Sequence, residues 1–134
     1  MDVLVNIDVD DLDKAVRFYG TAFGLGVGRR FGASAVEMLG SPVPIYLLQR
    51  DGDTVASETT SQRRNYARHW KPVHLDFVVD DIERAVEVAI NAGALVEGEI
   101  ATHPWGRLAL MADPFGHGFC FVQFLGRGYD EVAD

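Results

Sequence analysis

LVNIDVDDLDKAV, residues 4–16, aligns without a gap on HLDFVVDDIERAV, residues 74–86, seventy positions later. Farther along, YLLQ at 46–49 matches CFVQ at 120–123, seventy-four positions apart. A self-match at a nearly constant offset indicates one supersecondary unit that is used twice. We therefore expect any cleft to lie where the two copies meet, and each residue of one copy can be compared with its counterpart in the other.

The bulk properties are those of a small soluble domain. The 134 residues are 48% hydrophobic, which is enough to bury a core at an ordinary single-domain size. The formal net charge of −8 is spread along the chain and disfavours nucleic acid and anionic membranes as partners. We expect one domain, with modules over about 1–50 and 72–125, a linker over about 51–71 and a tail over 126–134.

The sequence predicts a cytoplasmic location. Cys120 is the only cysteine, so no internal disulfide can form and a reducing compartment is expected. The N-terminus shows no basic start followed by an apolar stretch, and no apolar run reaches membrane length, so we expect neither a signal peptide nor a membrane span.

Each copy predicts a strand, a helix and three further strands. Apolar residues alternate with polar or mixed ones over 3–9 and 73–79, as in strands with one apolar face. Asp10 and Asp80, each with a carboxylate three residues on, resemble the start of a capping box and predict helices directly after these strands. The later strands are expected at 26–31, 34–39, 43–49, 95–100, 107–112 and 118–124.

Three phrases carry a resemblance to a known family. They are VDDLDKAVRFY at 9–19, its repeat VDDIERAV at 79–86, and DPFGHGF at 113–119. With the doubled βαβββ order, they resemble the vicinal oxygen chelate superfamily, which includes glyoxalases, bleomycin-resistance proteins and extradiol dioxygenases. The resemblance implies an α+β fold of two tandem βαβββ modules that form a curled, cup-shaped mixed sheet with helices on the outer face. It also implies a homodimer.

The resemblance further implies where a metal would bind. In metal-dependent members the ligands lie on the first and last strands of each module, and the matching positions here are Leu4, Tyr46, His74 and Cys120. Leucine has no ligand atom and tyrosine is an uncommon ligand, so only His74 matches fully. We therefore expect no cofactor and no four-ligand metal centre. The alternative is a divalent metal held in part by His74.

Other polar residues are expected on the inner side of the cup. Asn6, Asp8 and Asp76 alternate in phase with Leu4 and His74, so they should point inward. They could bind a ligand, complete a shifted metal site or act as a general base. The alternative is that they bond to linker residues, because inward polar groups need partners.

Further residues complete the candidate set. Glu37 and Arg107 are assigned to the same cavity, with an internal salt bridge as the alternative. Trp105 and Tyr46 offer aromatic surface to a flat ligand or fill the core. Cys120, in an apolar strand, is more typical of an inert buried thiol than of a nucleophile. The candidate ligand-binding residues are Asn6, Asp8, Glu37, Tyr46, His74, Asp76, Trp105, Arg107 and Cys120.

Two functions remain open at this stage. The favoured one is a small-molecule binding protein like the bleomycin-resistance proteins, with a metal-free cup that holds a small apolar or aromatic compound. The other is a divalent-metal-dependent lyase, isomerase or dioxygenase of the glyoxalase type. Its ion would be held by His74 and relocated oxygens from Asp8, Asp76 or Glu37.

Overall fold

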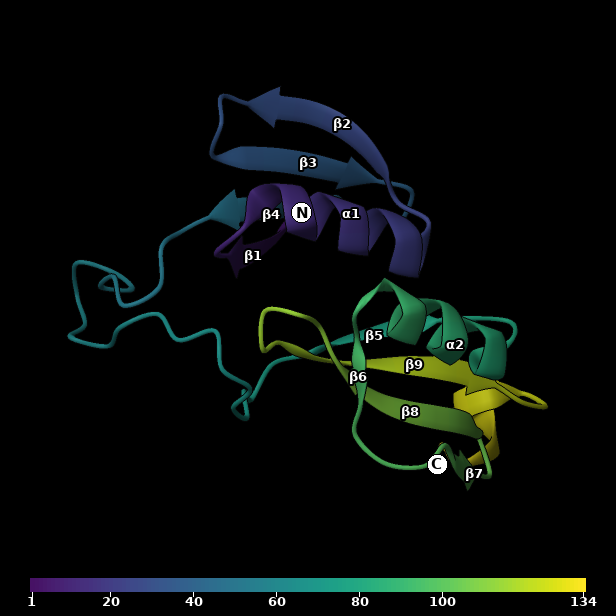
Figure 1. The fold of residues 1–134 in the computed structure, drawn as a ribbon. Helices are drawn as coiled ribbons and strands as arrows, with labels where there is room; N and C mark the ends of the chain where they lie inside the picture. Colours follow the sequence, from purple (N-terminus) through teal and green to yellow (C-terminus); the bar gives the residue numbers. More distant parts are fainter. The chain divides into compact units, whose positions relative to one another are not determined.

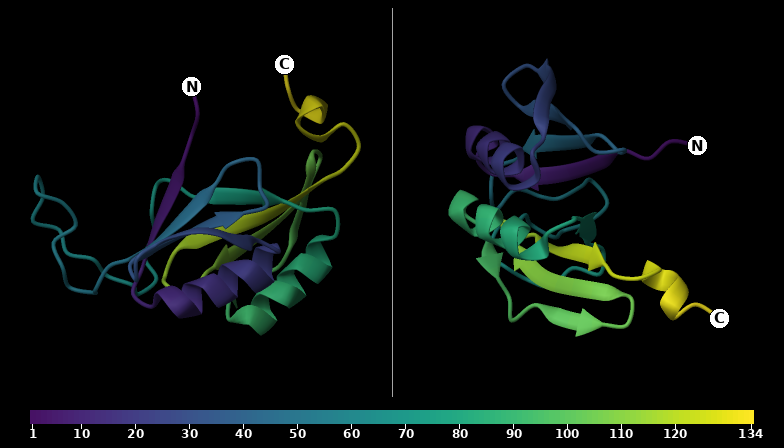
Figure 2. Two further views of the ribbon diagram at one scale, coloured as in Figure 1. Left: turned by 90° about the horizontal axis from the view of Figure 1, so that it is seen from above. Right: turned by 90° about the vertical axis from the view of Figure 1, so that its right-hand side faces the viewer.

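The computed structural model describes all residues from Met1 to Asp134, which form two compact units, Met1–Ala67 and Arg68–Asp134. Each unit is an open mixed sheet with one long helix, which confirms the predicted α+β class (Figure 1). In both units the helix lies on one face of that unit's own sheet (Figure 2). Neither of these helices has the length and apolar character that a bilayer crossing requires.

Unit 1 has the predicted βαβββ order. It contains β1 (Val5–Val9), α1 (Leu12–Phe23), β2 (Gly26–Phe31), β3 (Ala35–Leu39) and β4 (Ile45–Gln49). The strands lie in the order β1-β4-β3-β2, with β1 parallel to β4 and the other neighbours antiparallel. α1 packs on β3 and β4, where Val36, Leu47 and Phe18 are fully buried. The alternation along each strand therefore sends one set of side chains into this core.

Unit 2 repeats this order with one change. It contains β5 (Leu75–Val78), α2 (Ile82–Ala92), β6 (Leu95–Val96), β7 (Ala101–His103), β8 (Gly106–Ala112), β9 (Gly118–Phe124) and the short 3-10 helix η1 (Gly128–Glu131). The strand order is β5-β9-β8-β6, and β7 also pairs with β8. As in unit 1, the first and last long strands, β5 and β9, are parallel.

The prediction of a single strand over 95–100 is wrong. Val96 pairs with Met111 and Ala101 pairs with Leu108. The chain therefore advances by five residues from Val96 to Ala101, while its partner β8 advances by three. The two extra residues loop out at Gly98, whose φ of 119° is accessible mainly to glycine. β6 and β7 are thus two pieces of one interrupted strand.

Both helices begin one residue later than the sequence indicated. The N-caps are Asp11 and Asp81, whose carboxylates accept hydrogen bonds from the backbone N–H groups three residues on, at 3.0 and 3.1 Å. Asp10 and Asp80 lie just before them. The later start is consistent with the burial of Leu12 and Ile82, which come directly after the caps and face the core.

A second acceptor reaches each helix from the last strand of its own unit. Gln49 Oε1 accepts from the backbone N–H of Leu12, and Gln123 Oε1 accepts from that of Ile82, both at 3.0 Å. These glutamines end the matched phrases YLLQ and CFVQ. The sequence repeat therefore encodes how each sheet holds its helix.

Candidate functional site

Strand register defines the face of each sheet that lies opposite its helix, which we call the open face. In unit 2, both Asp76 and Leu110 pair with Cys120, so these three side chains share one face. Gln123 lies an odd number of residues beyond Cys120 and reaches α2 on the other face. The open face of unit 2 is therefore the face that carries Asp76, Leu110 and Cys120.

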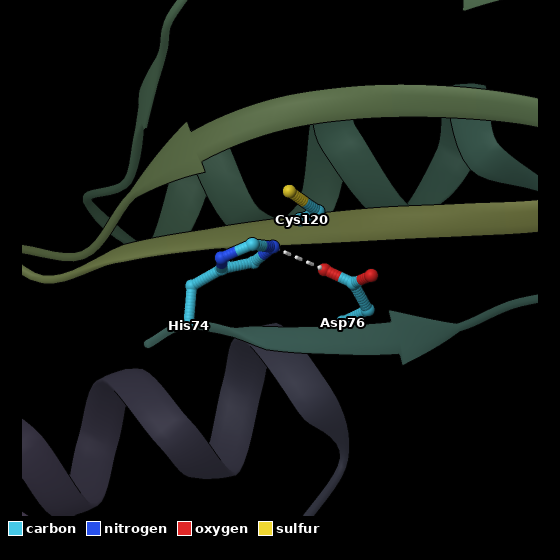
Figure 3. A group of neighbouring side chains, drawn as sticks. All are labelled: His74, Asp76 and Cys120. Carbon is cyan, nitrogen blue, oxygen red and sulfur yellow. Dashed lines mark ion pairs between the residues drawn. The ribbon is translucent and has the colours of Figure 1, made fainter. Parts of the chain in front are cut away.

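Three donor groups meet on the open face of unit 2 (Figure 3). His74 Nε2 lies 3.1 Å from Asp76 Oδ1, and one ligand atom from each of His74, Asp76 and Cys120 lies within 4.8 Å of the others. His74 and Asp76 are exposed, whereas Cys120 is buried in β9. The sequence selected all three residues, and the structure brings them together.

The environment of Cys120 keeps its thiol protonated. Burial, followed by the negative charge of Asp76, raises the pKa of the thiol to about 12. Only the thiolate acts as a nucleophile or binds a metal. We therefore expect the Cys120 thiol to be unreactive at neutral pH when no metal is bound.

A pocket of about 230 Å³ opens beside His74 and Cys120, and we call it the unit 2 pocket. Its volume lies below the range of roughly 300–1,000 Å³ that is typical of sites for drug-sized ligands. A compound smaller than a typical drug therefore fits it best. The pocket is lined by Arg68, Trp70, Lys71, Val73, His74, Glu97, Leu110, Met111, Gly118, Phe119 and Cys120.

On the open face of unit 1, Glu37 is saturated by internal bonds. Glu37 Oε1 accepts from the backbone N–H and the side-chain Nε of Arg29, at 3.1 and 3.0 Å. Glu37 Oε2 accepts from Arg29 Nη2 at 2.6 Å and from the hydroxyl of Tyr46 at 2.8 Å. The Arg29 guanidinium lowers the pKa of Glu37 to about 2, with help from Tyr46. Four donors occupy the acceptor sites of this carboxylate, which leaves none for a metal.

Asp8 is held by the linker. Arg64 Nε donates to Asp8 Oδ2 at 2.7 Å, and the rest of the guanidinium donates to Thr54 Oγ1 and to the carbonyl oxygens of Val55 and Ala56. The alternative in which an inward carboxylate bonds to a linker residue therefore describes Asp8. The same contacts fasten the linker to β1.

Arg107 lies on the opposite face from the one we predicted. It pairs in register with Gln123, on the helix side of the sheet, and its Nη2 lies 2.5 Å from the carboxylate of Glu83 in α2. The prediction that Arg107 faces the cavity is wrong, and the internal salt bridge is what the structure contains.

Trp105 lies outside the unit 2 pocket. Its ring stacks on His103 with centroids 5.0 Å apart, and it also contacts Phe124 and, in η1, Tyr129. The aromatic surface predicted for Trp105 thus belongs to a separate cluster with His103, Phe124 and Tyr129.

Two of the four positions that the resemblance assigned to a metal, Leu4 and Tyr46, lie in unit 1. Leu4 has no donor, and the hydroxyl of Tyr46 is bonded to Glu37 and Arg29. Asn6 pairs in register with Tyr46 and is exposed. The donors that fit a metal are therefore those of His74, Asp76 and Cys120 in unit 2.

Three basic residues beside the candidate residues were not selected from the sequence. Arg29 was assigned only to a strand, and Arg68 and Lys71 fall in the part of the chain that we expected to be a surface connection. That part of the sequence has no periodicity from which a side-chain direction could be inferred.

Comparison with known proteins agrees with this fold. A family model described as a glyoxalase-like domain matches residues 4–122. The anthracycline biosynthesis protein DnrV of Streptomyces peucetius is 30% identical over 131 residues, which are 96% of this chain and 43% of DnrV. DauV of Streptomyces sp. (strain C5) is 29% identical, over 97% of this chain and 43% of DauV. The chain thus spans less than half the length of these relatives.

Solved structures share the architecture at low identity. A glyoxalase/bleomycin resistance protein/dioxygenase family enzyme from Burkholderia phytofirmans PsJN gives a TM-score of 0.74 at 22% identity, over 93% of this chain and 100% of that one. The fosfomycin resistance protein FosX from Listeria monocytogenes gives 0.69 at 17%, over 92% and 90%. The resemblance seen in the sequence is confirmed for family and fold.

Proposed function

The chain belongs to the family of glyoxalase-like domains, and we propose that it is a small-molecule binding domain whose ligand occupies the unit 2 pocket. One observation carries this proposal. The candidate carboxylates of unit 1 are paired with arginines, whereas Asp76 of unit 2 is not. In unit 1, Glu37 and Asp8 are engaged by arginines of the same unit. In unit 2, His74 and Asp76 remain exposed beside a pocket.

The bonds of unit 1 also argue against the family's usual metal chemistry. A metal at Tyr46 would have to displace the hydrogen bonds that its hydroxyl makes with Glu37 and Arg29. Leu4 would contribute nothing. A ligand that binds through the exposed groups of unit 2 requires no such rearrangement.

The names of the relatives favour a small organic ligand. DnrV is named for anthracycline biosynthesis and FosX for fosfomycin resistance. We extend to this chain only what these names share, which is a small organic compound. The pocket volume of about 230 Å³ supports a compound of modest size.

A metal-dependent enzyme is the second candidate, and the donor cluster of unit 2 favours it. Imidazole, carboxylate and thiolate are ligands that zinc accepts, and catalytic zinc sites use three protein ligands with an open fourth position. His74, Asp76 and Cys120 are the residues that would hold the ion, which would supply a Lewis acid. Asp8 and Glu37, the other relocated oxygens that we considered, already have arginine partners.

Metal analysis separates the two candidates. Protein purified without a histidine tag is analysed for metal, and its melting temperature is followed during zinc titration. The variants are His74→Ala and, as a control from the linker, His69→Ala. If the chain is a binding domain, we expect it to contain no stoichiometric metal and its melting temperature to stay the same as zinc is added. Stoichiometric zinc that stabilises the protein and is lost only in His74→Ala would establish the second candidate instead.

The binding proposal itself is tested by nuclear magnetic resonance. We expect members of a library of small apolar and aromatic compounds to shift the amide resonances of pocket residues such as Gly118 and Cys120. Resonances of the Trp105 cluster serve as the control region. A library in which no compound shifts the pocket resonances at millimolar concentration would overturn the proposal.

A further inference from the structure

Lys71 is a cation of the unit 2 pocket that has no carboxylate partner. Its ammonium group donates to the carbonyl oxygen of Gly116 at 3.2 Å and forms no ion pair. An ammonium group has three N–H donors, so two remain for a ligand. The nearest acidic influence comes from Asp113, but that buried carboxylate accepts hydrogen bonds from the backbone N–H groups of Phe115 and His117.

The other charged groups of the pocket are already paired. Arg68 Nε and Nη2 each donate to the carboxylate of Glu97 at 3.0 Å, and Nη1 donates to the carbonyl oxygen of His69. His74 lies against Asp76. The uncompensated charge of the pocket is therefore the positive charge of Lys71.

Partial burial makes this charge unfavourable. Desolvation, followed by repulsion from Arg68, lowers the pKa of Lys71. A cation removed from water is stabilised most effectively by an anion that hydrogen bonds to it. The pocket is thus better suited to an anionic group than to a neutral or a cationic one.

The pocket that contains Lys71 is also lined by exposed apolar side chains. Trp70 lines the pocket and is 78% exposed, which is unusual for a large aromatic side chain. Leu110 and Val73 add exposed apolar surface to the same pocket. An indole ring pairs well with another planar ring, by stacking or by edge contact.

We propose that the unit 2 pocket binds a small planar compound with an anionic substituent, a carboxylate or a phenolate, which pairs with Lys71 while its ring lies against Trp70. This inference rests on the proposed binding function and names its ligand class. The pocket volume of about 230 Å³ limits the compound to about one ring system rather than a polycycle.

Benzoate and benzamide form a matched pair of probes, because they have nearly the same shape and differ in charge. We expect benzoate to shift the amide resonances of Lys71 and Gly118 and to quench tryptophan fluorescence, with benzamide weaker by about tenfold. Lys71→Met should weaken the binding of benzoate by a similar factor and leave the binding of benzamide unchanged. Lys71→Arg should retain benzoate binding, and Trp70→Leu should weaken both probes.

Lys14→Met is the control, because Lys14 is the only other lysine of the chain and lies in α1. Benzamide binding as tightly as benzoate, or benzoate binding that survives Lys71→Met, would overturn the inference while the pocket still binds compounds, so the proposed function would stand. If neither probe nor any compound of the wider library shifts the pocket resonances, the proposed function fails together with the inference.

Discussion

Replacement of Asp76 by asparagine is expected to make the thiol of Cys120 more reactive. The structure raises the pKa of this thiol from 9.0 to about 12, first through burial and then through the charge of Asp76. A rise of this size lowers the thiolate fraction at pH 8 by about a thousandfold. A more basic thiolate is also a better nucleophile, which raises the rate constant of the thiolate itself by about twentyfold. The folded protein should thus react about fiftyfold more slowly than an ordinary thiol, before any steric exclusion.

The assay is free of interference because Cys120 is the only cysteine. Alkylation by iodoacetamide at pH 8 is followed by mass spectrometry, with the folded protein compared with the same protein in urea. Asp76→Asn removes the second cause of the shift, which is smaller than burial, and should accelerate alkylation of the folded protein severalfold. Asp51→Asn, an exposed carboxylate in the linker, is the control. A folded protein that reacts as fast as the unfolded chain would refute this reasoning, as would an Asp76→Asn variant that reacts no faster.

Three further predictions concern the scaffold. Gln123→Met removes the acceptor of the buried Ile82 N–H, so urea denaturation should show a loss of about 2 kcal/mol, and an unchanged midpoint would contradict the capping role. The Arg29 guanidinium lowers the pKa of Glu37 from 4.5 to about 2, so stability should fall as the pH drops from about 4.5 towards 2, and Glu37→Gln should flatten that part of the stability–pH curve. Gly106→Ala places a Cβ against the carbonyl oxygen of Gln123 and should cost at least about 2 kcal/mol of unfolding free energy; a wild-type melting temperature would exclude this clash.

The elements of the fold that depend on local pattern were predictable. Helical spacing located α1 and α2, and alternation located β1 and β5, because these patterns report which side chains face a core. The N-caps were misplaced by one residue because each cap lies in an Asp-Asp pair. Local sequence does not distinguish the two aspartates. The choice depends on where Leu12 and Ile82 must face, which is a tertiary requirement.

The broken strand of unit 2 depends on distant partners. Glu97 lies between β6 and β7 and bonds to Arg68, which is 29 positions earlier in the chain. No local sequence pattern predicts the pairing of Glu97 with Arg68. The sequence therefore predicted one continuous strand over 95–100, and long-range pairing interrupted it.

The candidate site was predictable where it followed from strand phase. Asp76 and Cys120 occupy positions whose direction is fixed by the paired strands β5 and β9, and His74 lies directly before β5, so sequence could group the three residues. Arg107 was assigned to the wrong face, since a shift of one residue in register reverses the direction of every side chain. Lys71 was missed because the linker has no periodicity from which a direction can be inferred.

The arginine partners of unit 1 could not be found from sequence for a different reason. Glu37 and Arg29 meet because β2 carries a register irregularity between Val27 and Arg30. Asp8 meets Arg64 because the linker returns to β1. Both pairs depend on the path of the backbone, which composition and spacing do not determine.

The twin glutamines that join each sheet to its helix also make the protein a practical scaffold for engineering. Gln49 and Gln123 act on the helix side of their sheets, whereas the proposed ligand site uses side chains of the open face of unit 2. A combinatorial library that randomises Lys71, His74 and Leu110 would leave both helix attachments intact. Selection for new ligands could then begin from a population in which most members still fold.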